Sequence, residues 1–374
     1  MGINNSSDSR EIIVREMSCN ETDQWDSYVL SKESSSCYHL SAWMRSIKNV
    51  YGHKCYWIIA TREDSFNSNN IEIFGVLPLV HIKHIIFGNT LVSLPYADLG
   101  GIQADSPEIE SALIHFSVDL CKRVGAKKIE FRTDRAPAMY CDMQIPEINV
   151  SSWKVRMMFN LPDDPDLMFG GLKSKLRSQI RKPEKEGMQF RIGSTNLLND
   201  FYNVFCENMR DLGSPVHALE WFRSVLEEYG NRSRIGVVYF GKQPVAAGLI
   251  LFCGDTVSIP WASSLRKYNA LSPNMLLYWD FLKYSCENGY KRFDFGRSTP
   301  GTGTYKFKEQ WGAIPNILYL ITIGLSKNNK RQLNVLNISN NRNITKELAI
   351  NVWRKLPASL TYSLGPMIRK YISL

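Results

Sequence analysis

The sequence lacks any run of 18 apolar residues, and its N-terminus has no apolar stretch of signal-peptide length. Nothing in it therefore predicts a membrane-spanning helix. It also lacks CxxC spacing, because its eight cysteines are scattered and none stands with the six histidines in a metal-ligand pattern. These absences argue against a zinc site and a disulfide framework and fit a reducing compartment. We expect a cytoplasmic protein that needs no metal.

Acidic residues are scarce at the C-terminus. Residues 326–374 contain nine Lys or Arg and one acid, Glu347, which gives +8 out of a net charge of +9 for the whole chain. The rest of the chain is therefore near neutral, and the tail is the basic element.

The tail also carries an apolar strip. Ile344, Leu348, Val352 and Leu356 recur every four residues beside Trp353. An apolar strip flanked by cations is typical of a helix that lies on an anionic membrane, and it is equally typical of a helix that packs on the protein. We therefore predict either peripheral contact of residues 340–374 with the inner face of the cell membrane or packing on the body.

The length of 374 residues exceeds that at which one hydrophobic core usually stops growing, so two domains are expected. SPEIESALIHFSVDLCKRVGAKKIEF begins at Ser106, and SPNMLLYWDFLKYSCENGYKRFDF begins at Ser272, 166 residues later. Both begin with Ser-Pro, which favours a helix start, and both continue past a glycine into an alternating strand pattern. The sequence thus predicts an internal repeat of two α/β units.

The stretch from Trp261 to Gly312 contains most of the chain's reactive side chains. A helix is expected from Ser272-Pro273 to Gly289, with the Ser272 hydroxyl as its cap, followed by a strand over 291–296. A polar loop over 297–304 then leads to Tyr305-Lys306-Phe307-Lys308. This order predicts a rigid scaffold that ends in a polar site.

A second notable stretch, residues 172–187, is strongly basic. Leu172, Leu176 and Ile180 form a narrow apolar line, and six cations cover the remaining surface: Lys173, Lys175, Arg177, Arg181, Lys182 and Lys185. A helix docked by one edge could use these cations to bind phosphate, or they could be a solvated charged face. Pro183 is expected to kink the helix or end it early.

Together, six motifs resemble the FemAB-like branch of the GNAT acyltransferase superfamily, and most closely the FemAB-related proteins of exopolysaccharide and exosortase PEP-CTERM gene clusters. The motifs are HLSAW at 39–43, GVLPLVHIKHIIFGNTLVSLPYADLGG at 75–101, KLRSQIRKPEKEG at 175–187, SPNMLLYWDFLKYSCENG at 272–289, FDFGRS at 293–298 and YKFKEQWG at 305–312. The resemblance implies an α/β fold with mixed sheets and tandem GNAT-like domains. We expect a disordered lead-in at 1–11, GNAT-like domains at 12–152 and 153–325, the second including the basic helix 172–187, and a partly helical basic tail at 326–374.

The resemblance further implies an N-acyltransferase or aminoacyltransferase. Such an enzyme moves an acyl group from acyl-CoA or aminoacyl-tRNA to an amine on a cell-envelope glycan precursor, of exopolysaccharide or peptidoglycan type, that is linked to a nucleotide or a lipid. It must hold the donor carbonyl, accept a proton and stabilise an oxyanion. Two alternatives stay open: an RNA-binding protein that uses the basic helix and tail, and a non-catalytic GNAT-like scaffold in polysaccharide assembly.

Site residues follow from the same resemblance. Lys308 would stabilise the oxyanion or the leaving oxygen, and Asp294 would orient the amine or take its proton, unless its role is a structural hydrogen bond. The predicted substrate-binding residues are Tyr96, Asp98, Lys175, Arg177, Arg181, Trp261, Arg297, Ser298, Tyr305, Lys306 and Phe307. Trp261, Tyr305 and Trp311 would stack on a sugar or pack in a core. Arg266, Lys267, Ser272 and Asn274 would hold donor phosphate, although their loop lacks the glycines of a usual CoA grip.

Overall fold

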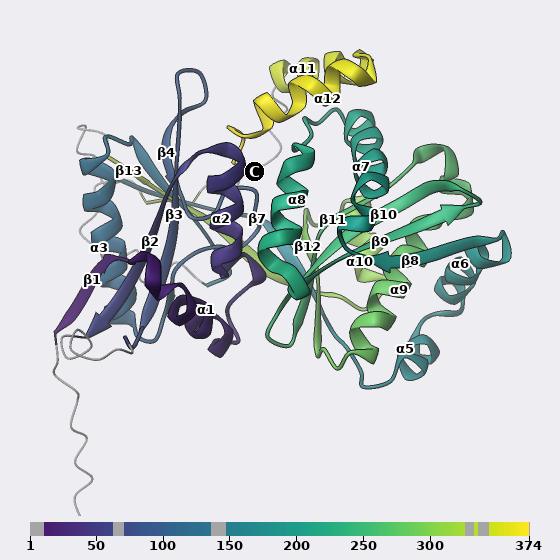
Figure 1. The fold of residues 1–374 in the computed structure, drawn as a ribbon, viewed down its shortest axis with the longest axis horizontal. Coiled ribbons are helices and arrows are strands. Elements are labelled where there is room, and N and C mark those ends of the chain that lie inside the picture. The colour runs from purple at the N-terminus through teal and green to yellow at the C-terminus, as the bar shows by residue number, and fades with distance from the viewer. Residues whose placement is uncertain (1–10, 63–70, 136–146, 326–332, 336–343, 374) are drawn as a thin grey trace, which may run out of the picture.

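The structure is a computed structural model that describes residues 11–62, 71–135, 147–325, 333–335 and 344–373 (Figure 1). Within these residues, fourteen strands form one mixed sheet, against which the helices pack. Nearly all of the predicted lead-in lies outside the described residues.

Two halves of the chain repeat one order of elements, strand, two helices, three strands, helix, strand. The first half has β1 (Ile12–Glu16), α1 (Thr22–Ser31), α2 (Ser41–Tyr51), β2 (Lys54–Arg62), β3 (Gly75–His84), β4 (Gly88–Val92), the short β5 (Gln103–Ala104), α3 (Pro107–Arg123) and β6 (Lys128–Thr133). The second has β8 (Met188–Gly193), α7 (Leu198–Leu212), α8 (Leu219–Tyr229), β9 (Ser233–Phe240), β10 (Gln243–Cys253), β11 (Thr256–Ser264), α9 (Pro273–Glu287) and β12 (Arg292–Ser298). The two-residue strand β5 is an addition of the first half and pairs with β3. In each half the last strand pairs in parallel with the third of the three longer strands, β6 with β4 and β12 with β11. The predicted internal repeat is therefore present.

The two halves exchange strands at the centre of the sheet. β7 (Glu147–Asn160) follows β6 in sequence but pairs with β12, whereas β13 (Ile314–Gly324) follows β12 but pairs with β6. The strand order is β1-β2-β3-β4-β6-β13-β7-β12-β11-β10-β9-β8. The predicted boundary between residues 152 and 153 falls inside β7, which is one continuous strand.

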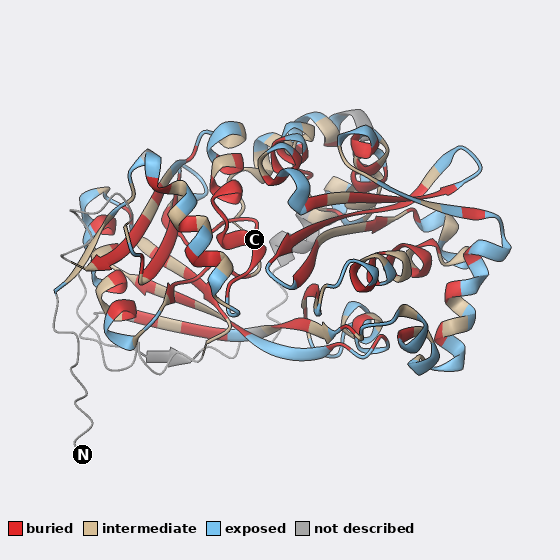
Figure 2. Ribbon diagram, turned by 60° about the horizontal axis from the view of Figure 1, so that its bottom comes forward, coloured by how far each residue is buried: buried red, intermediate tan, exposed pale blue. Residues whose placement is uncertain are grey.

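Three apolar clusters stabilise this arrangement. One packs α3 on the first half of the sheet, and another packs α9 on the second half. The third joins the halves, because it contains buried aromatic residues from both, including Trp43 on α2 and Trp221 on α8. Figure 2 shows the buried segments running along the strands of both halves. The space between the halves is thus fixed by apolar packing.

Two helical segments are interrupted or shortened. α1 and α2 are separated by residues 32–40, which include a short 3₁₀ turn at Cys37–His39. The basic segment 172–187 forms α6 (Ser174–Lys185), which is separate from the preceding α5 (Pro165–Gly171), because Leu172 and Lys173 adopt extended conformations with ψ of 146° and 143°.

Two prolines lie inside regular elements. β3 runs through Pro78. On one edge β3 pairs with β5 at Gly75 and Val76 and with β4 from Val80 onward, so the proline lies in a gap where a missing N–H is tolerated. Pro183 was expected to kink or end the basic helix, yet α6 continues to Lys185, because only its last turn must accommodate the ring.

The basic tail folds back on the body. α11 (Ile344–Lys355) and α12 (Ala358–Arg369) lie beside α7 (Figure 1). Ile350 approaches Gly213 so closely that a Cβ there would lie 2.5 Å from its Cγ2. Val352 of the predicted strip faces solvent, while the side chains of Ile344 and Leu348 lie outside the described part. Among the described helices none has the length and apolarity to cross a bilayer.

Candidate active site

A cleft of about 350 Å³ lies between the two halves and the tail. Its lining is drawn from the first half (Tyr38, Tyr96, Asp98), from α7 and the segment after it (Phe205, Met209, His217), from β11 and α9 (Ile259, Pro260, Trp261, Ala262, Tyr278), and from β12, α10 (Gly303–Glu309) and α12 (Phe295, Gly296, Arg297, Thr304, Lys308, Arg369). Segments that are far apart in the sequence therefore share one concave surface, the usual setting of a ligand site.

The cleft exists because β11 and β12 separate. They pair only at residues 256–258 and 292–294, and the residues that follow on both strands line the cleft. β4 and β6 separate in the same way after residues 90–92 and 128–130. There the loop 94–101 fills the gap. In the described residues, therefore, the second half keeps an open gap between its parallel strands and the first half does not.

Arg132 holds this loop, residues 94–101, in the first gap. Its Nη1 donates to the carbonyl oxygens of Leu94 and Ala97, both at 2.9 Å, and its own carbonyl accepts from Gly100 N at 3.1 Å. Leu94 and Tyr96 have positive φ values of 58° and 65°, a strained conformation for non-glycine residues. The loop is thus held tightly in place, and it presents Asp98 to the cleft.

Lys308 lies at the base of the cleft with its amine turned inward. The side chain is only 8% exposed, and Nζ donates to the carbonyl oxygens of Gly296 at 3.1 Å and Arg297 at 2.8 Å. Both carbonyls belong to an irregularity in β12, where the register with β7 shifts between Asp294 and Arg297. Gly296 makes this bulge possible with a φ of 73°.

Burial is the largest influence on the Lys308 amine and lowers its pKa to about 8. The negative charges of Asp98 and Asp294 oppose this lowering of the pKa, and the positive charges of Arg297 and Lys154 add to it. An amine with this pKa can be charged or neutral near physiological pH, which is a common property of catalytic groups.

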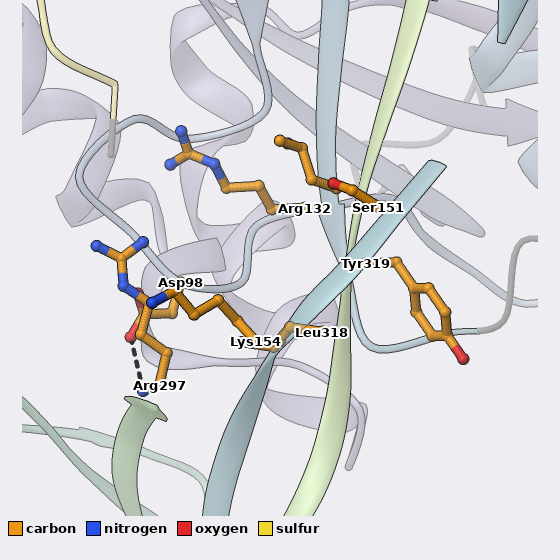
Figure 3. Close-up of a pocket in the computed structure, with 8 residues that line it drawn as sticks. Asp98, Arg132, Ser151, Lys154, Arg297, Leu318 and Tyr319 are labelled. Carbon is orange, nitrogen blue, oxygen red and sulfur yellow. Dashed lines mark hydrogen bonds and ion pairs between the residues drawn. The ribbon is translucent and has the colours of Figure 1, made fainter. Parts of the chain in front are cut away.

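Arg297 and Asp98 link the two halves across the cleft. Arg297 Nε lies 3.1 Å from Asp98 Oδ1, and Arg297 N donates to Asp98 Oδ2 at 3.1 Å. Figure 3 shows both side chains beside a smaller cavity of about 40 Å³, which Arg132 and Lys154 also line. Three cationic side chains thus surround one carboxylate there.

Residues 171–309 match the family model described as an acetyltransferase (GNAT) domain. Residues 171–309 form a GNAT domain. No curated protein matches the chain by sequence.

Solved structures share the fold of most of the chain. FemX aligns with a TM-score of 0.62 and 13% identity over 82% of this chain and 96% of its own. L-PGS from Bacillus licheniformis aligns with a TM-score of 0.55 and 13% identity over 96% of this chain and 98% of its own. A tandem GNAT protein from the clavulanic acid biosynthesis pathway aligns with a TM-score of 0.52 and 10% identity over 83% of this chain and 98% of its own. The predicted FemAB-like, tandem GNAT fold is therefore confirmed.

Asp294 lies beneath the GNAT domain's cleft and does not line it. It is 3% exposed and accepts hydrogen bonds from Arg156 Nε and Gly296 N, both at 2.8 Å, and from Ser258 Oγ at 3.5 Å. These contacts support the structural alternative, in which Asp294 fixes the bulge that holds Lys308.

The other residues predicted around Lys308 divide by face of α10. Thr304 and Lys308, four residues apart, line the cleft, whereas Tyr305 and Phe307 are half-buried against the second apolar cluster and Lys306 is exposed. Ser298 is buried. Trp261 lines the cleft and stacks on Trp43 at 5.7 Å between ring centroids. Trp311 is 2% exposed in the core, which is the core-packing alternative for this residue.

The predicted basic helix α6 does not line the cleft. Lys175 and Arg181 are exposed, Arg177 is half-exposed, and the Arg181 guanidinium lies over the Phe169 ring at 4.9 Å. Lys182 Nζ donates to Ala270 O at 2.7 Å, which places α6 beside the segment that precedes α9.

That segment holds the predicted donor-binding residues. Arg266 and Lys267 are exposed, and they contact Asp211 O at 3.0 Å and Glu207 Oε1 at 3.6 Å on α7. Ser272 has a φ of 57° and makes no capping hydrogen bond, so the predicted hydroxyl cap is wrong. Pro273 occupies the first position of α9, as predicted, and Asn274 follows it in the first turn.

Several residues that line the cleft were not predicted from the sequence. Tyr38, His217 and Tyr278 lie in segments read only as helices or loops, and Arg369 lies in the tail. The sequence did not mark them as site residues, since they come together only through the exchange of strands and the return of the tail.

We expect Asp294→Asn to lower the free energy of unfolding by about 3–5 kcal/mol, because it removes the nearer carboxylate of buried Arg156 and leaves only that of Asp134, at 3.6 Å. The matched control is Asp255→Asn, which removes an exposed pair with Arg292 and should cost less than about 1 kcal/mol. Chemical denaturation measures both. Equal effects would show that Asp294 is not a buried structural partner.

Proposed function

We propose that the protein transfers an acyl or aminoacyl group to an amine on a cell-envelope glycan precursor. The observation that carries this proposal is the buried amine of Lys308 at the open end of the β11–β12 gap in a GNAT domain. A charge placed there can act where the donor carbonyl is attacked.

In the proposed reaction the acceptor amine attacks the donor carbonyl carbon. A C–N bond forms, and the C–S bond of a thioester or the C–O bond of an aminoacyl ester breaks. The Lys308 ammonium stabilises the oxyanion of the tetrahedral intermediate. Asp98, the carboxylate among the described lining residues, takes the proton released by the amine, which finally passes to the leaving sulfur or oxygen.

The donor is acyl-CoA or aminoacyl-tRNA, and α6 favours a polyanionic donor. Its exposed cations lie beside the segment 266–271, which leads into α9 and carries two further exposed cations. Such a surface attracts phosphate groups over several ångströms and would guide a nucleic acid more strongly than a small thioester.

We also propose that the protein docks on the inner face of the cell membrane, where a lipid-linked acceptor would be found. The turn between β3 and β4 exposes Ile85 (98%) and Ile86 (79%), and α12 exposes Leu360, Leu364 and Met367 at helical spacing. The two segments adjoin, since the ring of Tyr371, which follows α12, packs on those of His84 and Phe87 with 4.2 and 5.9 Å between ring centroids. Exposed cations accompany this face: Lys83, Arg354 and Lys355. Apolar tips with flanking cations fit an anionic lipid surface.

Lys308→Ala should lower kcat by about a hundredfold or more while changing acceptor affinity little, because an oxyanion contact strengthens in the transition state. Steady-state kinetics with aminoacyl-tRNA and acyl-CoA donors measures it. A loss below about threefold would remove the proposed role of Lys308.

The wild-type kcat should fall as pH rises through about 8, since the charged amine predominates below the Lys308 pKa. Lys308→Arg keeps its charge there and should lose this pH dependence. A wild-type kcat that instead rises through pH 8 would identify neutral Lys308 as a base.

Arg177→Glu combined with Arg181→Glu should weaken aminoacyl-tRNA binding and flatten its salt dependence, because screening acts on those contacts. Binding is measured by filter retention at two salt concentrations. Glu184→Lys with Glu186→Lys, at exposed positions of the same segment, should have the opposite effect. Unchanged binding in both variants would leave α6 as a solvated charged face.

The wild-type protein should co-sediment with anionic liposomes at low salt, and Ile85→Ser with Leu364→Ser should reduce this sharply. Leu167→Ser is the control, because this exposed leucine lies on α5 at the other end of the molecule (Figure 1). Equal retention of both variants on the liposomes would contradict membrane docking through this face.

A further inference from the structure

The two adjoining cavities have an unbalanced charge. They share Asp98 and Arg297, and between them the described lining contains five basic side chains and one acidic one. The basic residues are Arg132, Lys154, Arg297, Lys308 and Arg369. Like charges gathered in a partly buried site repel one another, and nearby anions stabilise them.

The C-terminal tail supplies one of these cations. Arg369 ends α12, lines the cleft and lies over the Tyr96 ring at 5.3 Å. The tail is fixed by its backbone, because Lys370 O accepts from His53 Nε2 at 2.8 Å and from the Tyr96 hydroxyl, and Ser373 O accepts from Tyr96 N at 2.8 Å. Arg369 is therefore held in the wall of the cleft.

Arg132 lies behind this wall. Its Nη1 holds the loop 94–101, but its buried Nε and Nη2 have no hydrogen-bond partner in the described part of the chain. Burial lowers the Arg132 pKa to about 10, and the charges of Arg297 and Arg369 add to this effect. The positive charges of Arg297 and Arg369 thus both act on the Arg132 guanidinium.

We propose that Arg297 and Arg369 form a subsite for a phosphoryl group, with Arg132 behind them as a fixed positive charge. The subsite rests on the proposed function, since it would bind the phosphate-linked part of the acceptor and turn its amine toward Lys308. The tail is then part of the substrate site.

Charge favours a diphosphate over a carboxylate as the ligand. With Lys308 protonated, the lining residues sum to +4, and a single carboxylate would offset one of these charges. Guanidinium groups bind phosphate oxygens through paired N–H donors, which suits two arginines that face one ligand. A nucleotide-linked acceptor and a lipid-linked acceptor both contain this group.

The test measures binding of inorganic pyrophosphate to the full chain by calorimetry at low salt. Wild-type protein should bind pyrophosphate saturably and acetate much more weakly, and Arg369→Gln should weaken pyrophosphate binding about tenfold or more. Arg354→Gln is the matched control, because it removes the same charge from an exposed tail position on α11 and should change affinity less than about twofold. UDP and farnesyl pyrophosphate, used as further probes, distinguish nucleotide from lipid as the source of the phosphate.

A cooperative melt checks that each variant is folded. If Arg369→Gln does not melt cooperatively, Arg297→Gln takes its place and must again lose far more affinity than Arg354→Gln. Absence of saturable pyrophosphate binding in wild type, or equal losses in the cleft and control variants, would overturn the subsite. The proposed function is judged separately, because Lys308→Ala should abolish transfer while pyrophosphate still binds.

Discussion

The contact of Arg132 with the loop 94–101 is the interaction on which the site depends. In each half of the chain two parallel strands diverge after three paired residues, and a gap opens between them. In the first half, the Arg132 side chain and backbone bind the loop at three points and fill that gap. In the described part of the chain, the gap between β11 and β12 thereby stays open, and the closed gap becomes a rigid support for it.

That support carries a residue across to the other half. Asp98 extends from the loop to Arg297 and approaches the bulge at Gly296, where a Cβ would lie 3.4 Å from its Oδ2. The bulge in turn holds Lys308 through two carbonyl oxygens. Ion pairs contribute little net stability on average, and this half-buried pair matters for geometry, because both oxygens of Asp98 bind Arg297. A residue of the first half therefore helps to set the electrostatics of an amine in the second.

Local patterns in the sequence predicted local structure well. Ser-Pro and glycine marked the limits of α3 and α9, and alternation marked β6 and β12, because helix starts and strand faces depend on neighbouring residues. The exchange of β7 and β13 could not be predicted, since either strand offers the apolar pattern that either partner needs. Lys308 and Arg297 were found through family resemblance. Arg369 was missed because the tail is held largely through backbone carbonyls, which leave no side-chain signature.

The tail also shows how a basic, polar segment can become part of a core site. Arg354 and Lys355 are exposed, as the composition predicts, yet the pKa of Arg369 is lowered by burial, its largest influence. Burying a guanidinium costs free energy unless other groups offset it, and the Tyr96 ring and the carbonyl of Ile372 do so in part. The neighbouring arginines act in the opposite direction. A fold that keeps Arg297, Arg369 and Arg132 together therefore maintains a positive potential at one end of the cleft, and an anionic group of the substrate is the species that this potential would stabilise.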